Sequence, residues 1–128
     1  MDRNEKLERR LRDLEVEYRK LLEGELEEMA GGGYSPYLHD REPKYPVGKL
    51  YRRGFSQLTK LEAEIVELSG KLGADIGASA VPIAREFSRR FLAAWEGGWG
   101  GWWKGEQTAT AKDLLEKLRS LPAVETGG

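Results

Sequence analysis

Apolar residues recur along two stretches of the chain at alternating intervals of three and four residues. The first stretch has Leu7, Leu11, Leu14, Tyr18 and Leu21, and the second has Leu58, Leu61, Ile65, Leu68 and Leu72. This alternation is the seven-residue repeat of a helix that packs along a narrow apolar stripe. The order of intervals in one stretch is the reverse of that in the other. The pattern therefore predicts an antiparallel, coiled-coil-like hairpin in which Leu7 faces Leu72 and Leu21 faces Leu58.

The first helix carries signals at both ends. Asp2 and Glu5 form a capping box for the unpaired backbone N–H groups of its first turn, and the glycines at residues 31–33 end it. Beyond the repeat, the apolar stripe continues one position later, at Leu22, Leu26 and Met29. The shift arises because about 3.6 residues per turn do not match a seven-residue repeat. The shifted face offers a surface on which a third partner can pack.

The second helix is predicted to begin at Pro46 or Val47, because proline fits a first turn in which the N–H is unpaired anyway. It ends at Leu72, and Gly73 is its stop signal.

After a linker at residues 73–79, the remaining apolar positions predict two shorter helices. Ser79 caps the third helix. Its apolar stripe comprises Ala80, Ala84, Phe87, Phe91 and Ala94. The fourth helix runs from Thr110, which forms a second capping box with Asp113, to about Leu121.

The expected fold class is therefore all-α, an antiparallel helical hairpin followed by two shorter helices. The hairpin occupies residues 1–72 with a connector at 31–46, and residues 80–128 hold the C-terminal helices and a Gly/Trp loop. Charged residues make up 34% of the chain and hydrophobic residues 39%, a balance typical of long solvated helices with narrow apolar stripes. Such helices bury their stripes against partners.

Composition excludes some classes of function. The chain contains no cysteine, which excludes disulfides, thiolate metal sites and cysteine nucleophiles. It has no apolar run near the length of about 18 residues that a membrane helix needs, and its N-terminus is charged from Asp2 onward, unlike a signal peptide. We expect a protein without a membrane span, located in the cytoplasm, or in the host cytoplasm if the source is a virus.

The connector between the first two helices is basic and rich in tyrosine. Residues 31–60 carry 6 basic and 2 acidic groups, which gives +4, whereas residues 1–30 carry 7 basic and 10 acidic groups, which gives −3. Flat rings interleaved with cations suit contact with phosphates and bases. The candidate nucleic-acid-binding residues are Arg41, Lys44, Tyr45, Lys49, Arg52 and Arg53. Alternatively, the tyrosines fold back and close the apolar seam of the hairpin.

All four tryptophans lie in one glycine-rich stretch of residues 95–103, just after Phe91. They are Trp95, Trp99, Trp102 and Trp103. Three interpretations stay open. The indoles plug the end of the core, they anchor another subunit or protein, or they stack on a membrane surface, sugars or bases. These four residues and Phe91 are the candidate protein interface.

Convergent catalytic groups are scarce. The only histidine, His39, lies in the proline-rich connector, and no Glu-x-x-His pair suggests a metal site in a helix bundle. The glutamates, including Glu15 with Arg19 four residues later, are assigned to solvated outer faces, where ion pairs support helices. We therefore expect no enzyme, no metal and no cofactor.

Three functions fit these features. The first is a non-catalytic assembly or adaptor protein that buries its stripes by forming homo-oligomers. The second is a nucleic-acid-binding module that uses the basic connector, with DNA as the expected partner. The third is a small regulator or inhibitor that docks on a host protein through the tryptophan loop.

One family resemblance joins the first two functions. The basic, aromatic, proline-containing connector, with Pro46 leading into a leucine-seamed helix that ends at Leu72-Gly73, resembles the core of some phage terminase small subunits. These are non-enzymatic ring proteins that recognise viral DNA and feed it to the packaging motor. The resemblance covers about a third of the chain. The chain lacks a recognisable N-terminal helix-turn-helix, and residues 74–76 replace the short Leu-Thr-Pro turn often found in that family. These departures bear on DNA recognition.

Overall fold

The computed structural model describes residues 3–31, 46–96 and 107–124, with the side chains at 46–56, 91–96 and 107 left aside. The described residues form four α-helices and a short 3-10 helix, with no strand among them. The helices are α1 (Arg3–Ala30), α3 (Pro46–Leu72), α4 (Val81–Glu96) and α5 (Gln107–Arg119), and the 3-10 helix is η1 (Ile76–Ala78). The all-α prediction is confirmed.

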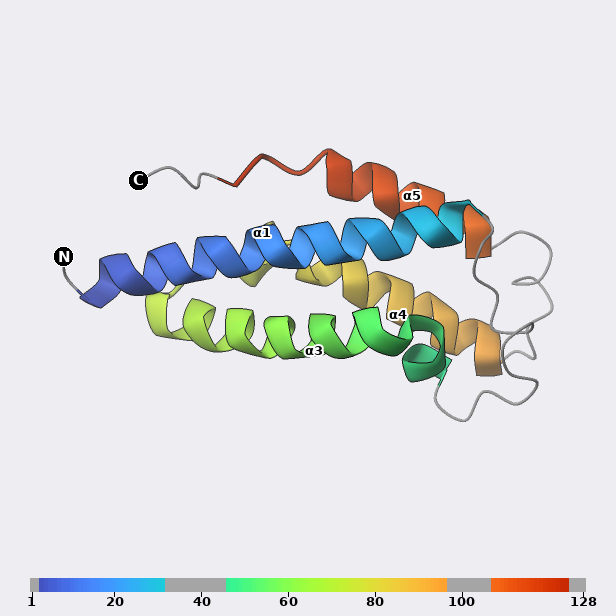
Figure 1. The fold of residues 1–128 in the computed structure, drawn as a ribbon, viewed down its shortest axis with the longest axis horizontal. Helices are drawn as coiled ribbons and strands as arrows, with labels where there is room; N and C mark the ends of the chain where they lie inside the picture. Colours follow the sequence, from blue (N-terminus) through green and yellow to red (C-terminus); the bar gives the residue numbers. More distant parts are fainter. Residues whose placement is uncertain (1–2, 32–45, 97–106, 125–128) are drawn as a thin grey trace.

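The four helices lie side by side and alternate in direction (Figure 1). Helix α1 contacts α3 and α5, and helix α4 contacts the same two helices. The C-terminal helices therefore pack on α1 and α3. This arrangement is an up-and-down bundle, in which each helix returns beside the one before it.

One apolar core runs through the bundle and takes residues from every α-helix. Its larger members from α1 and α3 are Leu14, Tyr18, Leu22, Leu26, Met29, Leu58, Leu61, Ile65 and Leu68. Those from the C-terminal helices and the residue before α4 are Ala80, Val81, Ile83, Phe87, Ala111, Leu114, Leu115 and Leu118. Leu7, Leu11 and Leu21 of the first seam are partly buried against this cluster. Among the described side chains, the predicted stripes thus lie mainly on the buried faces of their helices.

The shifted stripe of α1 is also buried, and α5 of the same chain packs on α1. Leu22 and Leu26 are fully buried. Beside them, the Arg119 guanidinium of α5 bonds to Glu23 at 3.1 Å and to Glu27 at 2.7 Å. The third partner on the shifted face is therefore α5 of the same chain.

The end of α3 follows the sequence closely. The helix ends at Leu72, and Gly73 adopts a φ of 68°, the left-handed conformation that glycine accepts without a Cβ clash. The Ala74 N–H donates to the Ser69 carbonyl at 2.9 Å, which closes the turn. The predicted start at Pro46 is also correct.

The predicted start of the fourth helix is wrong. Helix α5 begins at Gln107, three residues before Thr110, so Thr110 lies within the helix rather than at its cap. Thr110 is buried, and Ala111 beside it belongs to the core. Packing of this turn holds it helical, and tertiary contacts of this kind override a local capping signal.

Candidate functional site

Both segments that the sequence singles out for interaction are attached to the same end of the bundle. Residues 32–45 follow the C-terminal end of α1 and precede Pro46 of α3. Residues 97–106 follow Glu96 of α4 and precede Gln107 of α5. These four helix ends lie together, opposite the end that holds the start of α1 and the end of α3 (Figure 1).

The predicted interaction residues divide into two groups. Arg41, Lys44, Tyr45, Trp99, Trp102 and Trp103 lie outside the described residues. Lys49, Arg52 and Arg53 lie in the first turns of α3, and Phe91 and Trp95 lie in the last turns of α4. The structure describes the backbone but not the side chains of this second group. Their proposed roles stay predictions.

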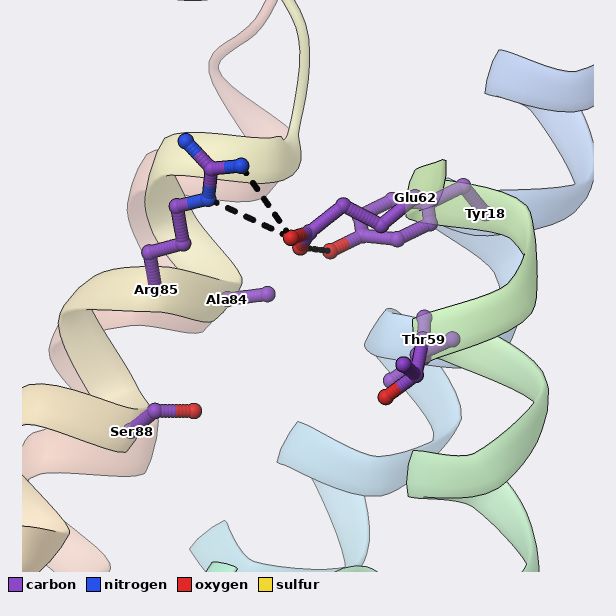
Figure 2. Close-up of a pocket in the computed structure, with 7 residues that line it drawn as sticks. Tyr18, Thr59, Glu62, Ala84, Arg85 and Ser88 are labelled. Atoms are coloured by element: carbon purple, nitrogen blue, oxygen red, sulfur yellow. Dashed lines mark hydrogen bonds and ion pairs between the residues drawn. The ribbon is translucent and has the colours of Figure 1, made fainter. Parts of the chain in front are cut away.

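A polar cluster joins α1, α3 and α4 near the middle of the bundle. The Tyr18 hydroxyl of α1 donates to Glu62 Oε1 of α3 at 3.2 Å. From α4, Arg85 donates to Glu62 Oε2 through Nε at 3.3 Å and Nη2 at 3.2 Å. Figure 2 shows the carboxylate lying between the phenol and the guanidinium. Glu62 therefore bridges three helices.

The cluster combines a neutral phenol with an ion pair, so it carries no net charge. Tyr18 is completely buried, and burial raises the pKa of its phenol well above the ordinary value, with the adjacent Glu62 carboxylate raising the pKa further. The hydroxyl therefore stays protonated and donates its hydrogen bond. Glu62 and Arg85 carry opposite charges, so their pair adds no net charge.

Next to the cluster, α3 and α4 line a pocket of about 190 Å³ that is partly open to solvent. Its lining adds Leu58 and Thr59 of α3, and Ala84 and Ser88 of α4. Thr59 and Ser88 face the space from opposite helices (Figure 2). Neither hydroxyl makes a hydrogen bond to a protein group within the described part of the chain, so both are available to a bound molecule.

The prediction that the glutamates occupy solvated outer faces is wrong for Glu15. It is only 8% exposed. Its Oε2 accepts the Ala80 N–H at 2.9 Å, just before α4, and the Arg19 Nε–H at 2.6 Å. The predicted pair with Arg19 exists, but it lies in the interior rather than on the surface. The reason is that α4 starts against this face of α1, so its unpaired N-terminal N–H groups meet the carboxylate.

The Glu15 network extends to the C-terminal segment. Arg19 Nη1 donates to the Pro122 carbonyl at 2.6 Å. In this way one carboxylate connects α1, the start of α4 and the residues after α5. Glu15 Oε1 is buried and has no hydrogen-bond partner in the described structure. Because this oxygen is almost completely shielded from solvent, its missing hydrogen bond is a cost of burial rather than a sign of a ligand position.

A sequence signal exists for one of these clusters. Tyr18 is the one residue in its predicted seam with a polar atom, and a buried phenol needs a hydrogen-bond partner. Leu61 is the expected partner of Tyr18 across the hairpin. Glu62 comes directly after Leu61, so it is a candidate acceptor for the hydrogen bond of the Tyr18 hydroxyl. Glu15 has no comparable signal, because a carboxylate beside an apolar seam is usually solvated.

No group of three or more possible metal-ligating side chains occurs among the described residues. Within the same residues, no helix combines the length and apolar character needed to cross a bilayer.

The fold and these clusters define an all-helical, up-and-down bundle with a small pocket and a buried carboxylate. Comparisons of the chain with family models, with curated proteins and with solved structures find no match.

Proposed function

We propose that the chain is a non-catalytic helical assembly or adaptor protein that acts as a homo-oligomer. In this proposal one end of the bundle engages the partner. This is the end where α1 and α4 finish and α3 and α5 begin. A small-terminase-like component of phage DNA packaging is the specific role that best fits, with DNA as the polyanionic partner.

One observation supports this function. The up-and-down topology attaches the basic, tyrosine-rich connector and the Gly/Trp segment to one end of the bundle, although more than 50 residues separate them in sequence. Basic residues attract phosphates, and tryptophans are favoured at the centres of protein interfaces. A protein that assembles and binds a polyanion through one surface needs both features together.

The first test is the solution mass of the purified chain over a concentration series, measured by light scattering after gel filtration. We expect a multimer of defined size. Replacing three tryptophans by serine (Trp99→Ser, Trp102→Ser, Trp103→Ser) should dissociate it, and circular dichroism should show unchanged helicity. A monomer at all concentrations, or an unchanged mass in the triple variant, would contradict the assembly role.

The second test addresses DNA. The native chain should retard duplex DNA in a mobility-shift assay at about 50 mM salt, because phosphate contacts strengthen as salt falls. Arg52→Glu with Arg53→Glu should abolish the shift. The matched control is Arg3→Glu with Arg9→Glu, which makes the same charge change at the opposite end of the bundle. Equal loss in both double variants would indicate only general charge attraction.

A further inference from the structure

The cavity between α3 and α4 has polar groups on two walls and apolar groups between them. Ala84 and Ser88 lie one turn apart on α4 and are too small to fill the space in front of α3 (Figure 2). Leu58 contributes an apolar wall from α3. The volume of about 190 Å³ is comparable with the cavity of about 150 Å³ that holds benzene in an engineered protein core. A single small ring can therefore fit.

The two facing hydroxyls determine what such a molecule must carry. Thr59 and Ser88 can each donate one hydrogen bond and accept others, and both are unpaired within the described residues. A hydroxyl or an amide group on the bound molecule can both donate and accept, so it can pair with either side chain. A purely apolar molecule would pair with neither hydroxyl.

The charges around the cavity disfavour an ion. Glu62 and Arg85 form a pair at 3.2 Å, so the charges beside the pocket already balance each other. A bound anion or cation would have to compete with this pair or bind without a counter-charge of its own. A neutral molecule avoids both costs.

We propose that this pocket binds a small neutral molecule, close to benzene in size, that carries a hydroxyl or amide group. Its apolar part contacts Leu58 and Ala84, and its polar group bonds to Thr59 or Ser88. The site is formed by the middle of α1, α3 and α4, so it does not depend on the proposed assembly function.

The test uses phenol and benzamide as probes on the full chain, followed by the amide shifts of the ¹⁵N-labelled protein. We expect both probes to bind with a Kd of about 1 mM, a value suited to so few ligand atoms, with the largest shifts around Thr59, Glu62 and Ser88. Benzoate and benzylamine, which have the same ring but a charge, should bind at least about tenfold more weakly, as expected for an unpaired charge in this site.

Near-isosteric variants separate binding from folding. Thr59→Val with Ser88→Ala removes both hydroxyls and should weaken phenol binding at least about fivefold, the effect of about one lost hydrogen bond. Ser120→Ala, which removes a hydroxyl at the end of α5, should leave binding unchanged. Ala84→Leu, which fills the space, should abolish it. Absence of binding by both probes at about 10 mM, shifts scattered away from this pocket, or undiminished binding in the double variant would overturn the proposal.

Discussion

The Glu15 carboxylate of α1 accepts the backbone N–H of Ala80, 2.9 Å away, across 65 residues of sequence. The contact fixes where α4 begins against α1. It also places a negative charge at the positive end of the α4 dipole, where an acidic group is stabilising. Glu15 also accepts a hydrogen bond from Arg19, and Arg19 donates another to the Pro122 carbonyl. The Glu15 side chain therefore connects distant parts of the bundle.

Replacing Glu15 by alanine should destabilise the fold by about 1–3 kcal/mol, because the buried Ala80 N–H loses its acceptor and Arg19 loses its counter-charge. Glu15→Gln should cost less, since the amide oxygen can still accept from Ala80. Urea unfolding monitored by circular dichroism measures both effects. Glu17→Ala, an exposed change on the same helix, should stay within about 0.5 kcal/mol of the native chain. Equal effects of the changes at positions 15 and 17 would refute the proposed role of Glu15.

Tyr18→Phe should destabilise the fold by about 0.5–1.5 kcal/mol, because it keeps the buried ring but removes the hydrogen bond to Glu62. The variant should also respond differently to alkali. Since the pKa of Tyr18 is raised in the folded chain, its contribution to stability is complete below the ordinary tyrosine pKa, about 10, and is lost as the pH rises above it.

The measurement for this alkaline effect is the unfolding free energy of both proteins between about pH 8 and pH 11. The native chain should lose more stability over this range than Tyr18→Phe. The difference isolates Tyr18, because the other tyrosines are present in both proteins. Parallel curves would show that the phenol at position 18 titrates as an ordinary one.

Glu25 should make stability depend on pH near neutrality. Burial, together with the smaller effect of the Glu28 charge, raises the pKa of Glu25 to about 7. The folded chain therefore holds a proton that the unfolded chain releases at a lower pH, so this contribution is complete below the ordinary glutamate pKa and is lost as the pH rises through about 7.

The side chain of Glu25 is partly exposed, so screening by solvent limits the change to about 1 kcal/mol between pH 5 and pH 8. Glu25→Gln, which cannot ionise, should remove this dependence and resemble the native chain at pH 5. Thermal unfolding at several pH values tests it, with Glu17→Gln as the matched control. An unchanged slope in Glu25→Gln would assign the pH dependence to other groups.

Gly70 within α3 and Gly73 just after its end should respond in opposite directions to alanine. Gly73→Ala should cost about 1 kcal/mol, because its φ of 68° is strained for a residue with a Cβ. Gly70→Ala should stabilise by about 0.5–1 kcal/mol, because Gly70 lies within the helix. No atom lies within 4 Å of an added Cβ at either site, so backbone conformation alone decides the sign. The same sign at both positions, in urea unfolding, would contradict this explanation.

The expected pairing of the two leucine seams can be tested by cross-linking. The chain contains no cysteine, so an introduced pair is unambiguous. Leu7→Cys with Leu72→Cys should form an intramolecular disulfide under mild oxidation, since the predicted register places these residues opposite each other. Leu7→Cys with Gln57→Cys should not, because Gln57 lies about four turns from Leu72. Non-reducing electrophoresis distinguishes the products, and equal cross-linking of both pairs would reject the register.

The sequence predicts only the part of the candidate site that lies on a single helix. The seven-residue repeat placed Tyr18 on the buried face of its helix, and a buried phenol requires a partner. That Arg85 completes the cluster depends on how α4 packs beside α3, and no local pattern specifies this. The cavity has the same origin, because Ala84 and Ser88 leave space only when another helix faces them.

By itself, the sequence determined the helices and their buried faces, because apolar periodicity, proline and glycine act on the backbone within a few residues. The start of α3 at Pro46 and its end at Leu72 follow from such local rules. The tertiary structure alone decided the environment of Glu15. This residue lies beside the seam of α1, where a hairpin of two helices would leave it in water, and it becomes buried because α4 begins against it. Whether a residue beside an apolar seam is buried depends on how many helices pack around its helix. The fold of the whole chain sets that number.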